Sequence, residues 1–207
     1  GSANPIFGGY IADTILAHNT IHNSAYSGVC LGWGWGEESY MRNVHAVNNS
    51  ITNPMLRLQD GGGLYTNVPC FNCNVSNNYF ASDSVKYGCL YHDSGSSYWN
   101  DENNVFNHIH TPIVFGHGSC PHITANKLYF NDSTRPNLQG ASNAGLADDN
   151  GVCLAPSYYS PPPGQFWANW PADAQQIVDT AGRRLAPDSI PPPTAPALSP
   201  SAPAPAQ

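Results

Sequence analysis

The chain has 207 residues, only 10% of them charged, and a formal net charge of −7 at pH 7 with seven Lys and Arg. Globular domains average about 25% charged residues, so uncharged polar residues must supply most of this surface. So few basic residues exclude the clustered positive charge of nucleic-acid-binding proteins, and we expect no nucleic-acid partner. No apolar run approaches the roughly 20 residues that span a bilayer, so we also expect no membrane insertion.

An asparagine-centred segment recurs along the first two-thirds of the chain. The asparagines at its central position are Asn19, Asn49, Asn78, Asn104 and Asn126, at spacings of 30, 29, 26 and 22 residues. This spacing is typical of a solenoid whose coils differ in loop length, and no segment has the sustained 3.6-residue apolar period of a helical repeat. Stacked asparagines can hydrogen-bond along the axis. We therefore predict an all-β, right-handed parallel β-helix of about five coils.

A second β-prone run follows each of the first four asparagine segments. The runs are residues 29–33, 56–60, 89–93 and 113–117, which align without gaps. Equivalent positions in successive coils stack about 4.8 Å apart. The last residues of the four runs therefore form a predicted column of Trp33, Asp60, Asp93 and His117.

The repeat fades near residue 135, which suggests three regions. We expect parallel β-helix coils over 1–135, and a wrapping loop with a C-terminal helix over 136–186. The helix is predicted over 170–184, because Pro171 suits its first turn and Gly182 its C-terminal cap. Eight of the 21 residues in 187–207 are proline, so we expect a disordered tail or linker there.

The column predicts a pair of carboxylates on neighbouring coils. Asp60 and Asp93 would lie about 5 Å apart, the separation that retaining glycosidases use for their nucleophile and acid/base, and a wider separation would suit inversion. A structural alternative is that both aspartates cap turns, since glycines follow each of them closely. The two roles are compatible, because catalytic groups often lie on loops at strand ends.

Several other side chains are candidates to line a saccharide cleft. Trp33 and Trp35 are separated by glycine, and exposed indoles stack on the apolar faces of sugar rings, although packing within the loop explains them equally well. Glu37 or Glu38 would add a third carboxylate unless both are solvated loop charges. The hydrogen-bonding candidates, each with a structural alternative, are Tyr65, His92 and His117.

Two motifs resemble a known family. The segments 60–65 (DGGGLY) and 91–97 (YHDSGSS) resemble paired signatures of secreted right-handed parallel β-helix glycoside hydrolases of the β-xylosidase and fucosidase/xylanase type. Segments 31–36 and 171–182 fit the same pattern. The resemblance implies Asp60 and Asp93 as the catalytic pair. Two features depart from it: His92 replaces an aliphatic residue, and family members carry many upstream coils. An N-terminal β-helix portion or a second chain would then cover the first coil.

Two other functions are compatible with a β-helix. A polysaccharide lyase needs a basic residue, often with Ca²⁺ held by carboxylates. Arg57 and Lys86 are its candidates here. A non-catalytic carbohydrate-binding or adhesive solenoid would bind saccharide without turnover, and fold alone does not separate these alternatives. The favoured reading is a glycoside hydrolase acting on plant or microbial polysaccharide, with oligo- or polysaccharide as its partner and no cofactor.

The cysteines and glycosylation sequons favour an extracellular location. Of six cysteines, Cys70 and Cys73 have the spacing of half a zinc site, but a matching second pair is missing, so we predict a disulfide within a loop and no metal. Six cysteines allow 15 pairings, and the sequence does not decide among them. Cys89 falls inside a predicted strand as a candidate buried free thiol. Sequons begin at Asn48, Asn74 and Asn131, and we expect a secreted glycoprotein.

Overall fold

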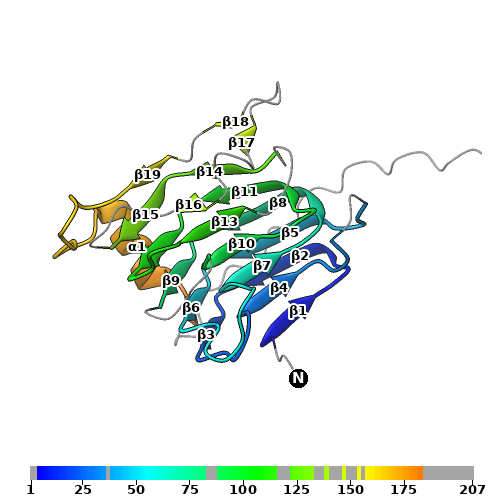
Figure 1. The fold of residues 1–207 in the computed structure, drawn as a ribbon, viewed down its shortest axis with the longest axis horizontal. Helices are drawn as coiled ribbons and strands as arrows, with labels where there is room; N and C mark the ends of the chain where they lie inside the picture. The colour runs from blue at the N-terminus through cyan, green and yellow to red at the C-terminus, as the bar shows by residue number, and fades with distance from the viewer. Residues whose placement is uncertain are drawn as a thin grey trace, which may run out of the picture.

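The structure is a computed structural model that describes residues 4–35, 38–82, 88–115, 122–132 and 157–183, and the backbone of strands at 138–139, 146–147 and 153–154. Strands succeed one another in triplets, and each triplet winds once around a common core (Figure 1). Five triplets, from β1–β3 to β13–β15, stack in register, and all neighbouring strands within the three large sheets are parallel. The predicted all-β parallel solenoid is confirmed.

The three sheets each take one strand from every coil. Sheet A contains β1 (Ile6–Gly8), β4 (Val29–Leu31), β7 (Leu64–Thr66), β10 (Leu90–His92), β13 (Ile113–Phe115) and β16 (Leu138–Gln139). Sheet B contains β2 (Ala12–Ala17), β5 (Arg42–Val47), β8 (Pro69–Ser76), β11 (Ser97–Glu102) and β14 (Thr124–Asn126). Sheet C contains β3 (Thr20–His22), β6 (Ser50–Thr52), β9 (Tyr79–Ala81), β12 (Val105–Asn107), β15 (Leu128–Asn131) and β19 (Tyr158–Tyr159), while β17 (Leu146–Ala147) and β18 (Cys153–Leu154) form an antiparallel pair.

The core is built from columns of like residues that stack along the solenoid axis. In sheet C the central residue of each strand points inward, and the column reads Ile21, Ile51, Phe80, Phe106 and Phe130. The phenylalanine ring centroids are 5.1 Å apart at each step, with Phe80 and Phe106 stacked and Phe106 and Phe130 tilted. Apolar burial of this kind contributes about 25 cal/mol per Å², so the columns supply much of the stability.

An internal asparagine ladder runs beside that column, at the turn from sheet B to sheet C. The side-chain amides of Asn19, Asn49 and Asn78 each donate to the side-chain oxygen of the next ladder asparagine, ending at Asn104, over 2.9, 3.0 and 3.0 Å. The backbone amides of the same three residues donate to the same oxygens. Each amide therefore satisfies backbone groups that the turn leaves without a sheet partner.

The sequence spacing placed Asn126 in this ladder, but in the structure Asn126 is not part of it. Asn126 pairs with Glu102 in sheet B, and Tyr129 pairs with Val105 in sheet C, so Leu128 stands next to Asn104. The fifth coil thus replaces the amide with an apolar side chain that is fully buried. The expected position was wrong by two residues.

The predicted strand at 56–60 is a loop, and the strand of that coil is β7, Leu64–Thr66. Met55 and Asp60 both have φ of 63°, which strand geometry does not allow. The backbone amides of residues 55–58 bond instead to carbonyls of the 24–26 loop in the preceding coil. In sheet A, Val29, Leu64, Leu90 and Ile113 are therefore in register, and the equal alignment of the four runs was wrong.

A single α-helix, α1 (Ala172–Thr180), covers part of sheet C in the described part of the chain (Figure 1). Its buried residues Ala174 and Ile177 pack against Val105 and Tyr129 of that sheet. After the helix, the backbone amide of Gly182 donates to the carbonyl oxygen of Asn48 over 2.7 Å. The helix thus lies across several coils, from the fifth back toward the second. It is shorter than predicted, and residues 184–207 of the expected helix end and tail lie outside the described residues.

The cysteines divide into bonded and free groups. Cys70 and Cys73 form a disulfide, but both lie within strand β8 and not in the expected loop. Cys30 and Cys89 are buried free thiols, and burial raises their pKa to about 11 and about 12. Cys89 immediately precedes β10 and lies outside the strand. No helix in the described part of the chain is long and apolar enough to cross a membrane.

The ladder gives a stability prediction. Replacing Asn78 with Ala removes the acceptor for Asn49 and the donor to the Ala46 carbonyl, which lies 2.9 Å from the Asn78 amide. Because buried groups lose their partners, the free energy of unfolding should fall by about 2–4 kcal/mol in urea titrations. Asn53→Gly, at an exposed left-handed position that bonds only Asn23 among described side chains, should cost much less. Equal losses would contradict a dominant role for the internal ladder.

The thiols give a pH prediction. Unfolding exposes Cys30 and Cys89 and lowers their pKa toward 9.0, so their contribution to stability is complete below pH 9 and is lost as pH rises toward 12. Above pH 9 each thiol should remove up to about 1.4 kcal/mol per pH unit from the free energy of unfolding. Urea titrations across this range should show a shallower decline in a Cys30→Ala/Cys89→Ala variant. An unchanged slope would show that the thiols ionise equally in both states.

Candidate functional site

The outer face of sheet A carries two tyrosines on neighbouring coils. Side chains alternate along each short strand, so Tyr65 in β7 and Tyr91 in β10 point outward while their strand neighbours point inward. The two residues are in register, and their rings meet edge to face with centroids 5.3 Å apart. This tyrosine pair is the floor of the candidate site.

Asp93 lies immediately after β10, beside the tyrosine pair. One carboxylate oxygen accepts hydrogen bonds from the Tyr65 hydroxyl and, over 2.9 Å, from the Trp35 indole N–H. The other oxygen accepts the backbone amide of Ser94 over 2.7 Å. Three donors thus fix the orientation of the Asp93 carboxylate.

Asp60 reaches the same pair from the other end of sheet A, because it lies in the loop that precedes β7. Its carboxylate accepts a hydrogen bond from the Tyr91 hydroxyl over 3.3 Å, and its carbonyl oxygen accepts the Tyr26 hydroxyl over 2.6 Å. The left-handed backbone at Asp60 turns the chain here. The Asp60 side chain is exposed, and among the described residues its carboxylate bonds no backbone amide, whereas the Asp93 carboxylate does.

Both carboxylates lie close enough to Tyr91 and Tyr26 to affect the pKa of each hydroxyl. Burial raises the pKa of Tyr91, and the charges of Asp93 and Asp60 raise it further. Burial also raises the pKa of Tyr26, and the same two charges add to that effect. Burial and the hydrogen bond to Asp93 raise the pKa of Tyr65. Among the described residues, neither carboxylate has an ion pair with Lys, Arg or His.

An exposed aromatic cluster adjoins Asp93. Phe7, Trp33 and Trp35 are 54%, 48% and 47% exposed. Their ring centroids follow one another at 5.9 Å and 5.0 Å. Left-handed backbone at Gly34 and Trp35 turns this loop back over the sheet, where the Trp35 indole bonds Asp93. The cluster offers apolar ring surface directly beside a carboxylate.

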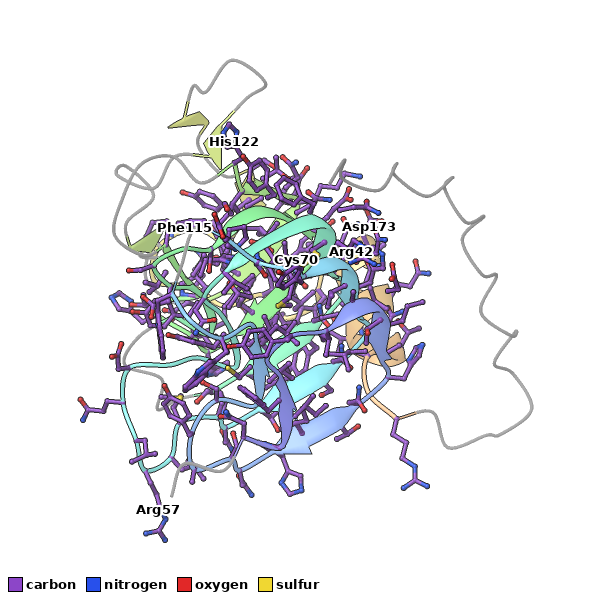
Figure 2. The ribbon with its side chains drawn as sticks, turned by 90° about the vertical axis from the view of Figure 1, so that its right-hand side faces the viewer. Arg42, Arg57, Cys70, Phe115, His122 and Asp173 are labelled. Atoms are coloured by element: carbon purple, nitrogen blue, oxygen red, sulfur yellow. A yellow bond between two sulfur atoms is a disulfide. The ribbon has the colours of Figure 1, made fainter. Side chains whose placement is uncertain are left out.

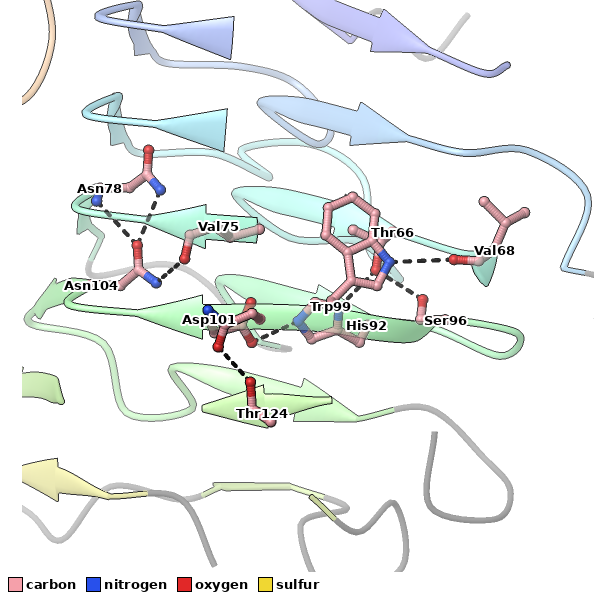
Figure 3. A network of polar contacts seen from close by, with 11 residues as sticks. Thr66, Val68, Val75, Asn78, His92, Ser96, Trp99, Asp101, Asn104 and Thr124 are labelled. Carbon is pink, nitrogen blue, oxygen red and sulfur yellow. Dashed lines mark hydrogen bonds and ion pairs between the residues drawn. The ribbon is translucent and has the colours of Figure 1, made fainter. Parts of the chain in front are cut away.

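His92 is placed differently from the other candidates. It is 1% exposed and points into the core, where its Nδ1 lies 2.8 Å from the Thr66 hydroxyl and its Nε2 lies 2.8 Å from the Asp101 carboxylate (Figure 3). Ser96 bonds the same Thr66 hydroxyl, and the Phe115 ring stacks on the imidazole. Both ring nitrogens are occupied, so His92 does not face the surface cluster.

The structure does not bring together the predicted column. The residues that follow the strands of sheet A in register are Gly32, Asn67 and Asp93, so Asn67 occupies the column position predicted for Asp60.

The remaining candidates lie elsewhere. His117, Glu37 and Lys86 lie outside the described residues, while Glu38 is exposed. Arg57 extends away from the core, from a loop and not from a strand (Figure 2).

Sequence reasoning missed three members of the site: Tyr26, Tyr91 and Phe7. Strict alternation in β10 would have put Tyr91 outward and His92 inward, so that signal was present in the sequence. Tyr26 reaches the site because its loop packs against the loop of the next coil, and no local pattern predicts that contact.

Among the described residues no group of three or more His, Cys, Asp and Glu side chains is placed to hold a metal ion.

Comparison with known proteins supports the architecture. No family model matches the chain, and no curated protein matches it. A solved structure described as a glycoside hydrolase superposes on 87% of this chain with a TM-score of 0.53 and 22% sequence identity. This chain spans 24% of the length of that protein. The likeness shows that both share the parallel β-solenoid fold.

The placement of His92 leads to a prediction. His92→Ala leaves the buried Asp101 carboxylate without its partner, so the free energy of unfolding should fall by about 3–5 kcal/mol. A double-mutant cycle with Asp101→Ala should give a coupling energy of about 0.5–3 kcal/mol. An unchanged free energy of unfolding would contradict the placement of His92 in the core.

Proposed function

We propose that the protein is a secreted carbohydrate-active protein, and that it is a glycoside hydrolase with Asp60 and Asp93 as its catalytic carboxylates. The observation that carries this proposal is the pair of carboxylates bonded to adjacent tyrosines, beside the exposed rings of Trp33 and Trp35. Aromatic rings present the apolar surface on which sugars stack, and carboxylates provide the acid and base of glycoside hydrolysis.

The two carboxylates suit different steps of hydrolysis. Three donors orient Asp93, as required of a carboxylate that faces the anomeric carbon and acts as nucleophile or activates water. Asp60 has a single side-chain hydrogen bond, from Tyr91, among the described residues and is open to solvent, so its carboxyl has access to the leaving oxygen and is the one assigned to protonate it. The glycosidic C–O bond breaks, the hydroxyl of water joins the anomeric carbon, and its proton balances the one given to the leaving group.

The extracellular assignment and the substrate class rest on further observations. The Cys70–Cys73 disulfide is of a kind that persists in oxidising compartments. The described part of the site has aromatic rings and carboxylates but no ion-paired cation, which suits neutral plant or microbial polysaccharide better than a uronate polymer. The fold likeness to a glycoside hydrolase is consistent with this class.

A non-catalytic carbohydrate-binding solenoid is the second candidate. The hydrogen bonds that Asp93 accepts from Tyr65, Trp35 and Ser94 favour it, because they give this carboxylate a role in holding the tryptophan loop. Such a protein would bind saccharide through Trp33 and Trp35 and release no product. A lyase would instead release an unsaturated uronate that absorbs in the near ultraviolet.

Conservative substitutions test the catalytic pair. Asp93→Asn and Asp60→Asn should each lower reducing-sugar release from xylan, arabinoxylan or β-glucan by at least about 100-fold, because each removes an acid or base from the reaction. Asp13→Asn is the matched control, since Asp13 also has a left-handed backbone and an exposed carboxylate but lies on sheet B.

Three results distinguish the candidates. Loss of activity in both site variants, with the control and the thermal unfolding midpoint unchanged, supports hydrolysis. Binding of xylohexaose by a wild-type protein that releases no reducing sugar would leave the non-catalytic solenoid. Near-ultraviolet absorbance from polygalacturonate would identify a lyase.

A further inference from the structure

A groove separates helix α1 from the outer edge of the turn between sheets B and C. It has a volume of about 400 Å³, within the roughly 300–1,000 Å³ range of small-molecule sites. One wall carries Asn48, Asn77 and Asn103 from three successive coils, with Lys127 from the next coil. These residues belong to the turn before sheet C, so the groove is separate from the tyrosine pair on the outer face of sheet A.

The three asparagines of the wall share one backbone conformation. Asn48, Asn77 and Asn103 each have φ of 55°, and Lys127 has φ of 50°. Each asparagine directly precedes a buried ladder residue, which points into the core. Asparagine tolerates the left-handed region better than most residues, so this position keeps its turn while presenting an amide outside the coil.

The amides of this wall lack partners that equivalent amides elsewhere have. The strands of sheet B also have left-handed residues one coil apart, and there the side chains bond one another: Asn43 to Asp13, and Asn72 to Asn43, each over 2.7 Å. Among described residues, the side chains of Asn48, Asn77 and Asn103 have no hydrogen bond, although their spacing along the axis is the same. Their donors and acceptors face the groove unused.

The opposite wall is a polar row of the helix. Asp173, Gln176 and Thr180 lie on one helical face and line the groove. The Asp173 carboxylate interacts with the Tyr129 hydroxyl, and its charge is opposed by that of Lys127 on the other wall. The rest of this lining is uncharged, so the groove favours a neutral ligand with many hydroxyl groups.

We propose that this groove is a second saccharide-binding site, which holds a neutral linear oligosaccharide along the solenoid axis. An amide donates and accepts hydrogen bonds, as a sugar hydroxyl does, and the amides recur at the coil step of about 4.8 Å, which is comparable with the length of one sugar unit. The inference stands on the groove alone and does not require hydrolysis on sheet A.

Side-chain amide signals in proton–nitrogen NMR spectra test the proposal directly. The protein is made in a host that does not glycosylate Asn48, which begins a sequon, and is titrated with xylohexaose or cellohexaose. To remove saccharide binding at the face of sheet A, the titration is repeated with the Trp33→Ala/Trp35→Ala variant. We expect the amide signals of Asn48, Asn77 and Asn103 to move in both proteins, and the signals of Asn43 and Asn72 to remain fixed.

Glycine variants then measure the contribution of each amide. Asn77→Gly and Asn103→Gly preserve the left-handed backbone while removing the side chain, and each should weaken binding in the tryptophan-less background by about two- to tenfold. Asn43→Gly is the matched control and should leave affinity unchanged.

The outcomes of this experiment separate the two sites. If the groove amides do not move, or if the tryptophan substitutions abolish all binding, the second site is overturned while the proposal for sheet A stands. Equal losses of affinity from Asn43→Gly and Asn77→Gly would also overturn it. Retained binding without reducing-sugar release by the wild-type protein would support the groove and contradict hydrolysis.

Discussion

Parallel stacking of coils in register is the constraint on which every other feature of this molecule depends. Each residue has as its axial neighbours the residues at the same position one coil before and one coil after, about 4.8 Å away. The choice of residue type at one position therefore acts on a whole column. Rings stack in the phenylalanine column of sheet C, and amides bond along the internal ladder.

At the turn from sheet B to sheet C, the inner and outer columns of asparagines have different roles. The inner asparagines satisfy backbone groups that a turn would otherwise leave unpaired, which makes the stack rigid. The side chains of Asn48, Asn77 and Asn103 in the outer column have no comparable structural task, because their side-chain amides bond nothing among described residues. Rigid support beneath unused polar groups is the arrangement that a binding site requires, and this is the basis for the second-site proposal.

The face of sheet A combines groups from separate parts of the coil. Asp93 arrives from the end of a strand, Asp60 from the loop before another strand, and Trp35 from a loop of an earlier coil. The tyrosine pair joins them, because each tyrosine hydroxyl reaches a different carboxylate. A hydrolase or a binding solenoid can be built from this arrangement, and the buried His92–Asp101 pair supports it from within the core.

The sequence by itself determined the parallel solenoid and the stacking of Asn19, Asn49, Asn78 and Asn104. It favoured a disulfide at the Cys70–Cys73 spacing without fixing the pairing of the six cysteines. These features repeat or are local, so spacing, alternation and residue type reveal them. It also predicted Asp60, Asp93, Trp33, Trp35 and Tyr65 as candidate site residues, but through an alignment that the structure corrects. The alignment assumed equal runs, whereas residues 56–60 form a loop and β7 begins at Leu64.

Only the tertiary structure decided which of these residues meet. A shift of one residue reverses the face of a strand, which is why His92 turned out to lie inside and Tyr91 outside. Loop lengths between coils set that register, and loops pack through contacts that leave no periodic trace in the sequence. The groove beside α1 depends in the same way on where the helix docks, which is decided by the apolar surface of sheet C.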